Sequence, residues 1–300
     1  MPSFKKLSIN DRDWMMEILK KEGTLSADYS FGNLFMWLGQ KGIYVTKSND
    51  RLLMKFGTGW NTRFFFPVGS GPVEPAISLI REVAKKEGAP LRIESVTEES
   101  RELLNQAFPG EFEFFEKRDS FDYIYEAETF TEMRGKKLHA KRNFCNRFEK
   151  TYEWNFEQLE KRHLPHCLKI LADWQAEMGT FTEGMKMEHS AIVRGFMCYE
   201  KLDFLGGVLR ANGEIVAFTI GEKIRSDCFD IHFEKANSEI AGAYPMIARE
   251  FARLVVNKHP DIKLFNREED MGIEGLRKAK ESFYPLYLLK KYRARERKDD

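Results

Sequence analysis

Apolar residues recur along this chain with two different periods, and each period predicts one kind of element. A spacing of three to four residues predicts amphipathic helices, whereas alternation or short apolar runs between turn residues predict strands. Residues Glu74–Lys86 show the helical spacing. Residues Phe204–Ala211 and Glu214–Lys223 show the strand pattern on either side of Asn212-Gly213, a pair that favours a tight hairpin turn.

The predicted elements follow the same order in both halves of the chain. In the first half they are a helix capped by Asn10 and ended by Gly23, a helix at Phe31–Trp37, strands Ile43–Thr46, Leu52–Phe56 and Arg63–Pro67, helix Glu74–Lys86, strand Leu91–Glu94, helix Glu98–Ala107 and strand Phe121–Tyr125. In the second half they are helices Leu164–Met178 and His189–Leu202, the hairpin, strand Cys228–Phe233, helix Ile240–Asn257, strand Lys263–Asn266, helix Ile273–Ser282 and strand Pro285–Tyr292. This order predicts an α/β protein with two tandem domains, residues 1–133 and 134–300.

Composition narrows the class of protein. The 42% of hydrophobic and 13% of aromatic residues suit a folded chain with a core. The 48 Lys and Arg residues against 47 Asp and Glu exclude a globally basic nucleic-acid coat protein and leave a local basic patch open. The longest uncharged apolar run, Tyr29–Gln40, is shorter than the roughly 18 residues of a spanning helix, and the cysteines lack metal-site spacing. We expect a cytoplasmic protein with reduced thiols, no metal and no membrane insertion.

Four stretches of the chain resemble a known family. They are Asp28–Trp37, Lys136–Asn143, Phe233–Asn237 and Asn266–Lys280, which read DYSFGNLFMW, KKLHAKRN, FEKAN and NREEDMGIEGLRKAK. Together with the repeated element order, they resemble the C-terminal domain of phosphatidylglycerol lysyltransferases, most nearly its soluble, uncharacterised members. The resemblance implies two tandem GCN5-related N-acetyltransferase-like domains, with mixed sheets flanked by helices, as in Fem-type aminoacyl transferases. It also implies that aminoacyl-tRNA is a partner.

One loop of the second half falls where enzymes of this fold bind the pyrophosphate of coenzyme A. That site uses free N–H groups at a helix N-terminus, and Gly242 stands where a glycine is expected. Glu239, Tyr244 and Pro245 depart from the pattern, because they add a carboxylate, add bulk and remove an N–H. The loop is therefore either an ordinary turn or a site for acyl-coenzyme A. The first-half loop, Gly69–Pro75, has two prolines and no basic residue, so we expect a degenerate first domain and an active cleft in the second.

The segment between the halves is basic and has helical spacing. From Arg134 to Lys150 it holds seven Lys or Arg residues and one acid. Its apolar residues Leu138, Cys145 and Phe148 are available for a buried face. The charges either lie on a solvated helix face or contact tRNA phosphates. The candidate tRNA-binding residues are Lys137, Lys141 and Arg142.

Three ionisable residues alternate along one predicted strand. Asp230, His232 and Glu234 occupy every second position, which places them on one face. Polar groups on a buried strand are costly unless they are paired or wet, so the pattern indicates a cleft. We predict that the three residues take part in acid–base catalysis, with a structural hydrogen-bond network as the alternative. Three ligands on one strand are poorly placed for a tetrahedral metal site, so no metal is predicted.

Other residues are candidates for substrate binding. Acids after the predicted strand Lys263–Asn266 either bind an ammonium group or match the dipole of the next helix. The predicted substrate-binding residues are Lys235, Tyr244, Asn266, Arg267, Glu268, Asp270, Arg277 and Lys280.

The sequence leaves three hypotheses for function. The first is a transferase that moves an aminoacyl group from aminoacyl-tRNA to an amine or hydroxyl of a small-molecule, peptide or lipid acceptor. The second is an acyl-coenzyme A-dependent N-acyltransferase that uses the same cleft. The third is a non-catalytic protein that kept the fold and binds RNA or another partner. The chain has no Gly-x-Ser-x-Gly, Walker or dinucleotide motif, which argues against hydrolases, nucleotidases and dehydrogenases.

Overall fold

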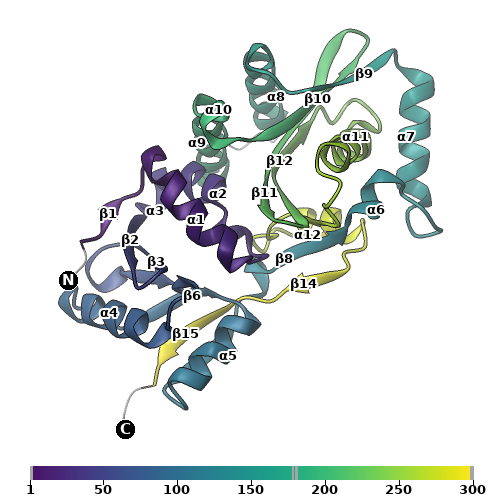
Figure 1. The fold of residues 1–300 in the computed structure, drawn as a ribbon. Helices are drawn as coiled ribbons and strands as arrows, with labels where there is room; N and C mark the ends of the chain where they lie inside the picture. The colour runs from purple at the N-terminus through teal and green to yellow at the C-terminus, as the bar shows by residue number, and fades with distance from the viewer. Residues whose placement is uncertain (1–2, 178, 180–181, 298–300) are drawn as a thin grey trace. The chain divides into compact units, whose positions relative to one another are not determined.

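The computed structural model describes residues 3–177, 179 and 182–297 of the chain. The chain forms two compact units, each built on its own β-sheet (Figure 1). Unit 1 comprises Met1–Asp122, Glu269–Ile273 and Leu288–Asp300, and unit 2 comprises Tyr123–Glu268 and Glu274–Tyr287. Among the described residues, no helix is both long and apolar enough to cross a membrane.

The sheet of unit 1 has eight strands in the order β1-β2-β3-β4-β6-β15-β7, with β5 paired to β3. The strands are β1 (Lys5–Lys6), β2 (Tyr44–Ser48), β3 (Arg51–Phe56), β4 (Arg63–Phe65), β5 (Val68–Gly69), β6 (Arg92–Val96), β7 (Phe112–Glu116) and β15 (Tyr292–Glu296). The helices are α1 (Arg12–Glu22), α2 (Phe31–Met36), α3 (Leu38–Lys41), α4 (Val73–Lys86) and α5 (Glu98–Ala107). Strands β4 and β6 run parallel, and the chain passes through α4 between them.

The sheet of unit 2 has seven strands in the order β14-β8-β13-β12-β11-β10-β9. The strands are β8 (Asp122–Glu126), β9 (Trp154–Gln158), β10 (Leu205–Ala211), β11 (Glu214–Arg225), β12 (Cys228–Ala236), β13 (Leu264–Asn266) and β14 (Tyr287–Leu289). The helices are α6 (Ala127–Thr131), α7 (His139–Thr151), α8 (Leu164–Glu177), α9 (Glu183–Met197), α10 (Tyr199–Leu202), α11 (Ala243–Lys258) and α12 (Glu274–Glu281). Strands β12 and β13 run parallel on either side of α11 in the chain, as β4 and β6 do around α4. The predicted class, α/β with mixed sheets flanked by helices, is confirmed.

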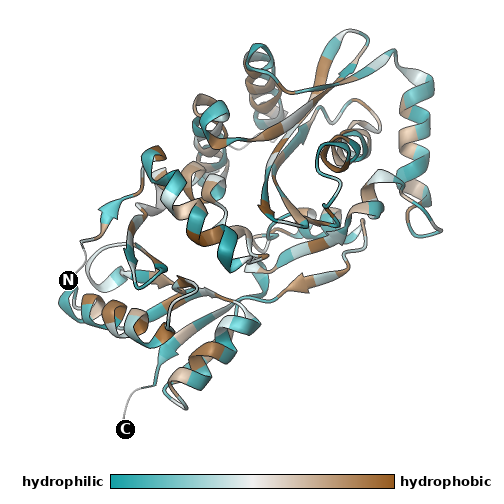
Figure 2. Ribbon diagram, viewed as in Figure 1, coloured by the Kyte–Doolittle hydropathy of each residue, from teal (hydrophilic) through white to brown (hydrophobic). Residues whose placement is uncertain are grey.

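Local sequence explains most element boundaries. The helix α4 buries Ile77 and Ile80 on one side and exposes polar residues on the other, so brown and teal alternate around its axis in Figure 2. The helix α1 ends at Gly23, which takes the left-handed conformation with φ 69° as predicted. Its start differs from the prediction, because Ser8 and not Asn10 caps a short 3-10 turn that leads into α1.

The sequence analysis missed four strands: the two-residue strands β1 and β5, and the longer strands β7 and β9. Strands β7 and β9 lie at the edges of their sheets. Both contain alternating apolar and polar residues, but each is only five residues long and most of its side chains are exposed or half-buried, so the apolar positions do not mark a buried face.

The two units exchange strands, which the periodicity did not reveal. The predicted strand Pro285–Tyr292 is two strands, and they join different sheets: β14 lies beside β8 in the second sheet and β15 joins the first. Strand β8, predicted to end the first domain, pairs with β13 in the second sheet. The units therefore differ from the predicted domains 1–133 and 134–300, because side-chain periodicity reports which face is buried and not which sheet a strand joins.

A buried lysine links two of the chain segments that make up unit 1. The Nζ atom of Lys291 lies 2.7 Å from a carboxylate oxygen of Asp122 and 2.7 Å from one of Asp28. Lys291 is 2% exposed and Asp122 is fully buried. Burial lowers the pKa of Lys291, but the two carboxylates outweigh it and raise that pKa well above its usual value. The ammonium group is therefore charged, and β15 is held to the end of the first chain segment by charge.

We predict that K291M destabilises the protein by about 3–5 kcal/mol, because it leaves Asp122 buried without its cation. The neighbouring Lys290 is the matched control, since its side chain is 50% exposed and forms a surface ion pair with Glu116. K290M should change the free energy of unfolding by less than about 1 kcal/mol. Urea denaturation of both variants measures the difference, and equal losses would contradict the role assigned to Lys291.

Candidate functional site

The site is built on two parallel strands that separate. Strand β12 pairs with β13 over three positions, from Cys228 opposite Leu264 to Asp230 opposite Asn266. Strand β13 ends there, where the buried Asn266 side chain accepts a hydrogen bond of 2.7 Å from the N–H of Glu268 and turns the chain. Beyond Asp230, no described strand lies beside this edge of β12. The opening between the strands is where this fold can place a ligand against backbone and side chains.

A bulge in β12 rearranges the side chains at this opening. Gly221 of β11 pairs with Ile231, and the preceding residue Ile220 pairs with Phe233. His232 is therefore an extra residue with no counterpart on β11. Such a residue breaks the alternation of faces along the strand.

The bulge corrects the prediction that Asp230, His232 and Glu234 share one face. Glu222 pairs with Asp230, and Thr219 pairs with Glu234. Thr219 and Glu222 are three positions apart on β11, so their side chains lie on opposite faces of the sheet. Asp230 and His232 therefore share one face with Glu222, whereas Glu234 lies on the other with Thr219.

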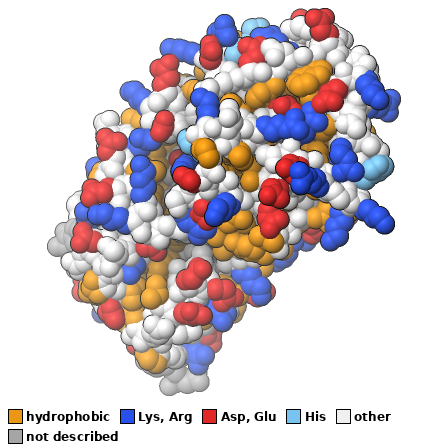
Figure 3. Space-filling view, turned by 45° about the vertical axis from the view of Figure 1, so that its right-hand side comes forward, with side chains coloured by type: hydrophobic (Ala, Val, Ile, Leu, Met, Phe, Trp, Pro, Cys, Tyr) orange, Lys and Arg blue, Asp and Glu red, His pale blue; other side chains and the backbone are white. Residues whose placement is uncertain are grey.

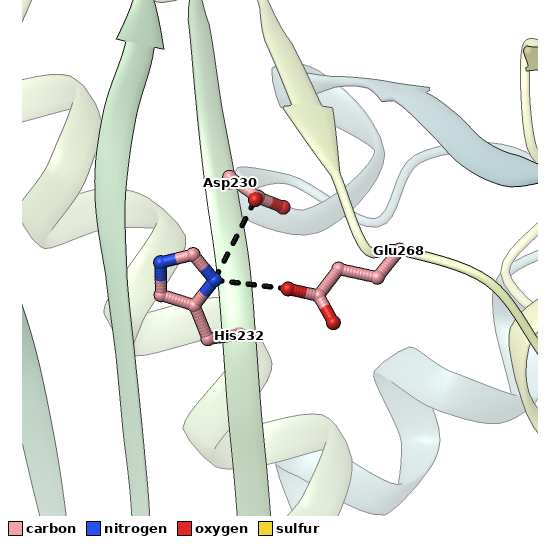
Figure 4. A group of neighbouring side chains, drawn as sticks. All are labelled: Asp230, His232 and Glu268. Carbon is pink, nitrogen blue, oxygen red and sulfur yellow. Dashed lines mark hydrogen bonds and ion pairs between the residues drawn. The ribbon is translucent and has the colours of Figure 1, made fainter. Parts of the chain in front are cut away.

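The first face holds a buried imidazole among carboxylates. Nδ1 of His232 lies 2.9 Å from Glu268 and 3.5 Å from Asp230 (Figure 4), and Nε2 lies 3.2 Å from Glu222. Burial lowers the pKa of His232, but Asp230 and the hydrogen bonds with Glu222 and Glu268 raise it well above its usual value. An imidazolium results, and it has no lone pair with which to act as a general base near neutral pH.

The same residues have the spacing of a metal site. Ligand atoms of Asp230, His232 and Glu268 lie within 4.8 Å of one another. A metal ion would require His232 to release its proton, and the neighbouring carboxylates hold that proton. The same side chains can therefore share either a proton or a metal ion, and the absence of a metal stays a prediction from the sequence.

The second face holds a buried carboxylate with one oxygen unused. Glu234 has an 8% exposed side chain, and its Oε1 accepts a 2.7 Å hydrogen bond from Arg267. Its Oε2 is buried and has no hydrogen-bond partner among the described residues, and the same holds for the hydroxyl oxygen of Thr219. Buried polar atoms are rarely left unpaired, so this pair of atoms is suited to a ligand.

A lysine and aromatic rings complete this group. The ammonium of Lys141 in α7 lies 4.3 Å from the ring centroid of Phe283, and the Arg267 guanidinium lies 5.4 Å from the same ring. Burial and the Arg267 charge lower the pKa of Lys141, while Glu234 opposes them. We call Thr219, Glu234, Arg267 and Lys141 the Glu234 cluster.

Most other predicted substrate-binding residues lie away from this cluster or make structural contacts. Lys235 projects to the opposite face, where it lies 3.6 Å from the Trp174 ring and 2.9 Å from Glu188. Lys280 donates to backbone carbonyls of the Asn266 turn, and Asp270 belongs to unit 1, where it contacts Arg118 at 2.9 Å.

Two more predicted residues lie on helices near the surface. Tyr244, in the first turn of α11, is 37% exposed, and Arg277 in α12 is half-buried.

The N-terminus of α11 does not fit the pyrophosphate of coenzyme A. A Cβ atom at Gly242 would lie 2.7 Å from the carbonyl oxygen of Phe144 in α7, so this glycine allows two segments to pack. The N–H of Ala243 already donates to Ile240, and Pro245 has none. The first turn of α11 is therefore a packing contact and not a cradle of free N–H groups.

The predicted helix of the basic segment is present from His139 on as α7, whereas Arg134, Lys136 and Lys137 lie in the loop before it. Lys and Arg side chains are frequent on the right of Figure 3. The segment's buried face consists of Leu138, Cys145 and Phe148, also as predicted. Arg142 donates to the carbonyls of Met133 and Gly135, so its guanidinium closes the preceding loop. Lys137 is exposed and lies 5.3 Å from the Tyr284 ring.

Thr219 and Glu222 are the functional candidates that the sequence analysis missed. Both lie in β11, a long and mostly buried strand. A polar residue in such an apolar strand was the signal in the sequence that could have identified them. Their partners on β12 depend on the bulge, which alternation alone does not locate.

Comparison with known proteins places the chain in a family. The family described as phosphatidylglycerol lysyltransferase, C-terminal, matches residues 21–295. A conserved protein of unknown function from Bacteroides thetaiotaomicron has a crystal structure with a TM-score of 0.94 and 35% identity, over 99% of this chain and 100% of that chain. An uncharacterised protein of Mycoplasmoides gallisepticum is 24% identical over 185 residues, which are 58% of this chain and 55% of that protein. This chain thus spans about half the length of that curated relative.

Solved structures with lower identity share the fold. L-PGS from Bacillus licheniformis has a TM-score of 0.66 and 18% identity over 97% of this chain and 93% of its own. FemX has a TM-score of 0.61 and 9% identity, over 97% and 96%, and a tandem GNAT protein from the clavulanic acid biosynthesis pathway has 0.51 and 9%, over 100% of both chains. The predicted tandem GCN5-related N-acetyltransferase fold is confirmed. Because the family match covers most of the chain, the protein belongs to the phosphatidylglycerol lysyltransferase C-terminal family.

Proposed function

We propose that the protein transfers an aminoacyl group from aminoacyl-tRNA to an amine or hydroxyl acceptor. Its family relationship supports a transferase of acyl or aminoacyl groups. The observation that favours an aminoacyl group is the unused Oε2 of Glu234 at the opening between β12 and β13. An aminoacyl ester carries an ammonium group, which a buried carboxylate oxygen binds strongly. A simple acyl group carries no such donor.

Thr219 supplies a second contact for the same ammonium. Its hydroxyl oxygen is buried beside Glu234 and also has no hydrogen-bond partner among the described residues. A site built from two such acceptors rejects an analogue that lacks the donor, because the site's polar atoms would then stay unpaired. The cluster therefore selects aminoacyl groups over acyl groups.

The reaction requires no covalent bond between the protein and the aminoacyl group. The acceptor nitrogen or oxygen bonds to the ester carbonyl carbon, the bond from that carbon to the tRNA ribose oxygen breaks, and the acceptor's proton passes to the departing ribose oxygen. The protein must orient the ester and stabilise the oxyanion between these steps. Lys141 is suited to the second task, because its ammonium group is held close to Glu234 and Arg267.

His232 acts in this scheme as a positioning residue. Its imidazolium connects Glu222 on β11 with Glu268 beyond the end of β13. It thus holds together the strands on either side of the opening, at the bulge that turns Glu234 toward its cluster. His232 and Asp230, which we predicted to be catalytic, thus position the site in this proposal.

The proposal predicts a measurable preference for the ammonium group. A suitable probe is 3′-aminoacylamino-3′-deoxyadenosine, which mimics the charged end of tRNA and resists hydrolysis, and its partner is the same molecule without the α-ammonium. We expect the first probe to bind at least about 30-fold more tightly, because each buried charge contact is worth roughly 2 kcal/mol or more. E234Q should abolish that preference, whereas E214Q, at an exposed hairpin position, should keep it. Equal affinities in the native protein, or binding of acetyl-coenzyme A in their place, would contradict the proposal.

A substitution at Thr219 tests ligand binding without an expected loss of protein stability. T219V removes a buried hydroxyl oxygen that has no partner, so we expect unchanged or slightly higher stability. Binding of the ammonium probe should nevertheless weaken by about five- to tenfold, the value of one hydrogen bond. Calorimetric titration and thermal melting of the same sample measure both effects. Loss of stability without loss of affinity would assign Thr219 to the core instead.

The state of His232 makes stability depend on pH in one direction. Its folded pKa lies above the unfolded value of about 6.5, so its contribution is complete below that pH and is lost as pH rises through the folded value. We therefore expect the native protein's advantage in unfolding free energy over H232N to be largest near pH 6 and to shrink toward higher pH. H139N, at an exposed position, should show no such trend. A difference that grows with pH would mean that His232 is neutral when folded.

A further inference from the structure

One face of the sheet in unit 1 gathers cations that the proposed site does not use. Phe65 of β4 pairs with Glu94 of β6, and Arg295 of β15 pairs with Arg92 of β6. Residues two apart on a strand share a face, which brings Arg63 and Arg293 to the same side. We call this set the arginine face: Arg63, Arg92, Lys117, Arg293 and Arg295.

The carboxylates on this face do not balance its positive charge. Glu94 lies 2.6 Å from Arg293, 3.2 Å from Arg63 and 3.5 Å from Lys117, so one carboxylate serves three cations. The exposed Glu113, opposite Arg295, is the other acid on these strands' shared face. Burial and then the charges of Arg63, Arg295 and Arg293 lower the pKa of Arg92, which reflects this repulsion. An anionic ligand would relieve it.

Exposed aromatic rings flank the arginines. Trp60, in the turn before β4, is 65% exposed and lies 5.5 Å from the guanidinium of Arg92. Phe115 of β7 is 43% exposed and lies 5.0 Å from that of Arg295. Large exposed rings are costly in water, and rings stacked among cations are the arrangement on which unpaired bases stack.

A cavity opens beside the same residues. Its volume is about 190 Å³, and the rings of Phe56 and Phe65 form part of its wall. Its charged lining consists of three cations, Arg63, Lys117 and Lys291, and three carboxylates, Asp28, Glu94 and Glu269. All of its lining residues belong to unit 1. The lining is thus balanced in charge, and what the cavity adds beside the arginine face is a recess with aromatic walls, which suits a base turned out of a strand.

We infer that the arginine face binds a single-stranded segment of RNA. Arg63, Arg92 and Arg295 would contact phosphates, and Trp60 and Phe115 would stack with bases. The identification of that RNA as the tRNA of the aminoacyl donor rests on the proposed function. This face assigns a role to unit 1, whose own loop between β5 and α4 has no basic residue for an anion.

The test compares two charge reversals of equal size. R92E/R295E changes the arginine face, and K20E/K85E makes the same change in net charge at exposed positions on α1 and α4. Fluorescence anisotropy with a labelled 12-nucleotide single-stranded RNA and with uncharged tRNA gives affinity at several salt concentrations. We expect R92E/R295E to weaken binding more than tenfold and to lower the slope of log K against log salt by about one to two. K20E/K85E should change neither quantity.

A third variant separates RNA from other polyanions. W60A should weaken RNA binding on the order of tenfold through lost stacking, with little change in the salt slope. An unchanged affinity in W60A, or tighter binding to phosphatidylglycerol vesicles than to RNA, would overturn the inference in favour of a purely electrostatic surface. Equal effects of the two charge reversals would overturn it as well.

The two proposals fail separately. Uncharged RNA carries no ammonium group, so its binding does not depend on Glu234. RNA binding by the arginine face without preference for the ammonium probe would reject only the proposed function. An ammonium preference together with RNA binding that R92E/R295E does not weaken would reject only this inference.

Discussion

Ion pairs on buried charged residues link the three chain segments of unit 1. Asp122 is the last residue of the first segment, Lys291 belongs to the last segment, and their charged groups lie 2.7 Å apart. Asp270, fully buried in the short middle segment, contacts Arg118 at 2.9 Å. A buried charge that loses its partner is strongly destabilising, so each segment requires the others. The exchange of strands β8 and β15 adds to this dependence, because neither half of the sequence contains all the strands of one sheet.

The bulge at His232 has a comparable effect on the site in unit 2. One extra residue divides the ionisable groups of β12 between two faces and thereby separates two kinds of chemistry. On one face an imidazolium is surrounded by carboxylates and is fully satisfied. On the other, Glu234 keeps an oxygen that no described residue uses. A regular strand would have placed the acids together, and Glu234 would then compete with Asp230 for the same cation.

Sequence reasoning found what depends on local pattern and missed what depends on pairing. The helix Glu98–Ala107 and the Asn212-Gly213 hairpin were predicted at or within two residues of their observed bounds. Helix caps, turns and buried faces depend on residues close together in the sequence, so a local pattern predicts them. The exchange of β8 and β15 was not predictable, because a strand's period is the same in either sheet. The single face assigned to Asp230 and Glu234 was wrong for a related reason, since a bulge is visible only in the register of two strands.

The two units differ in the groups that they offer to an anionic ligand. In this fold the helix after the fourth strand commonly offers free N–H groups to a phosphate, but here Gly242 brings that helix against the carbonyl of Phe144 and uses the approach for packing. A donor that is rich in phosphate then needs its anions held by side chains. The arginine face supplies such side chains on strands, where guanidinium groups can each grip a phosphate with two hydrogen bonds. Backbone N–H groups suit one compact pyrophosphate, whereas a row of arginines suits a repeating phosphate backbone. The packed N-terminus of α11 and the arginine face are therefore the two observations on which our proposal of a nucleic-acid donor depends.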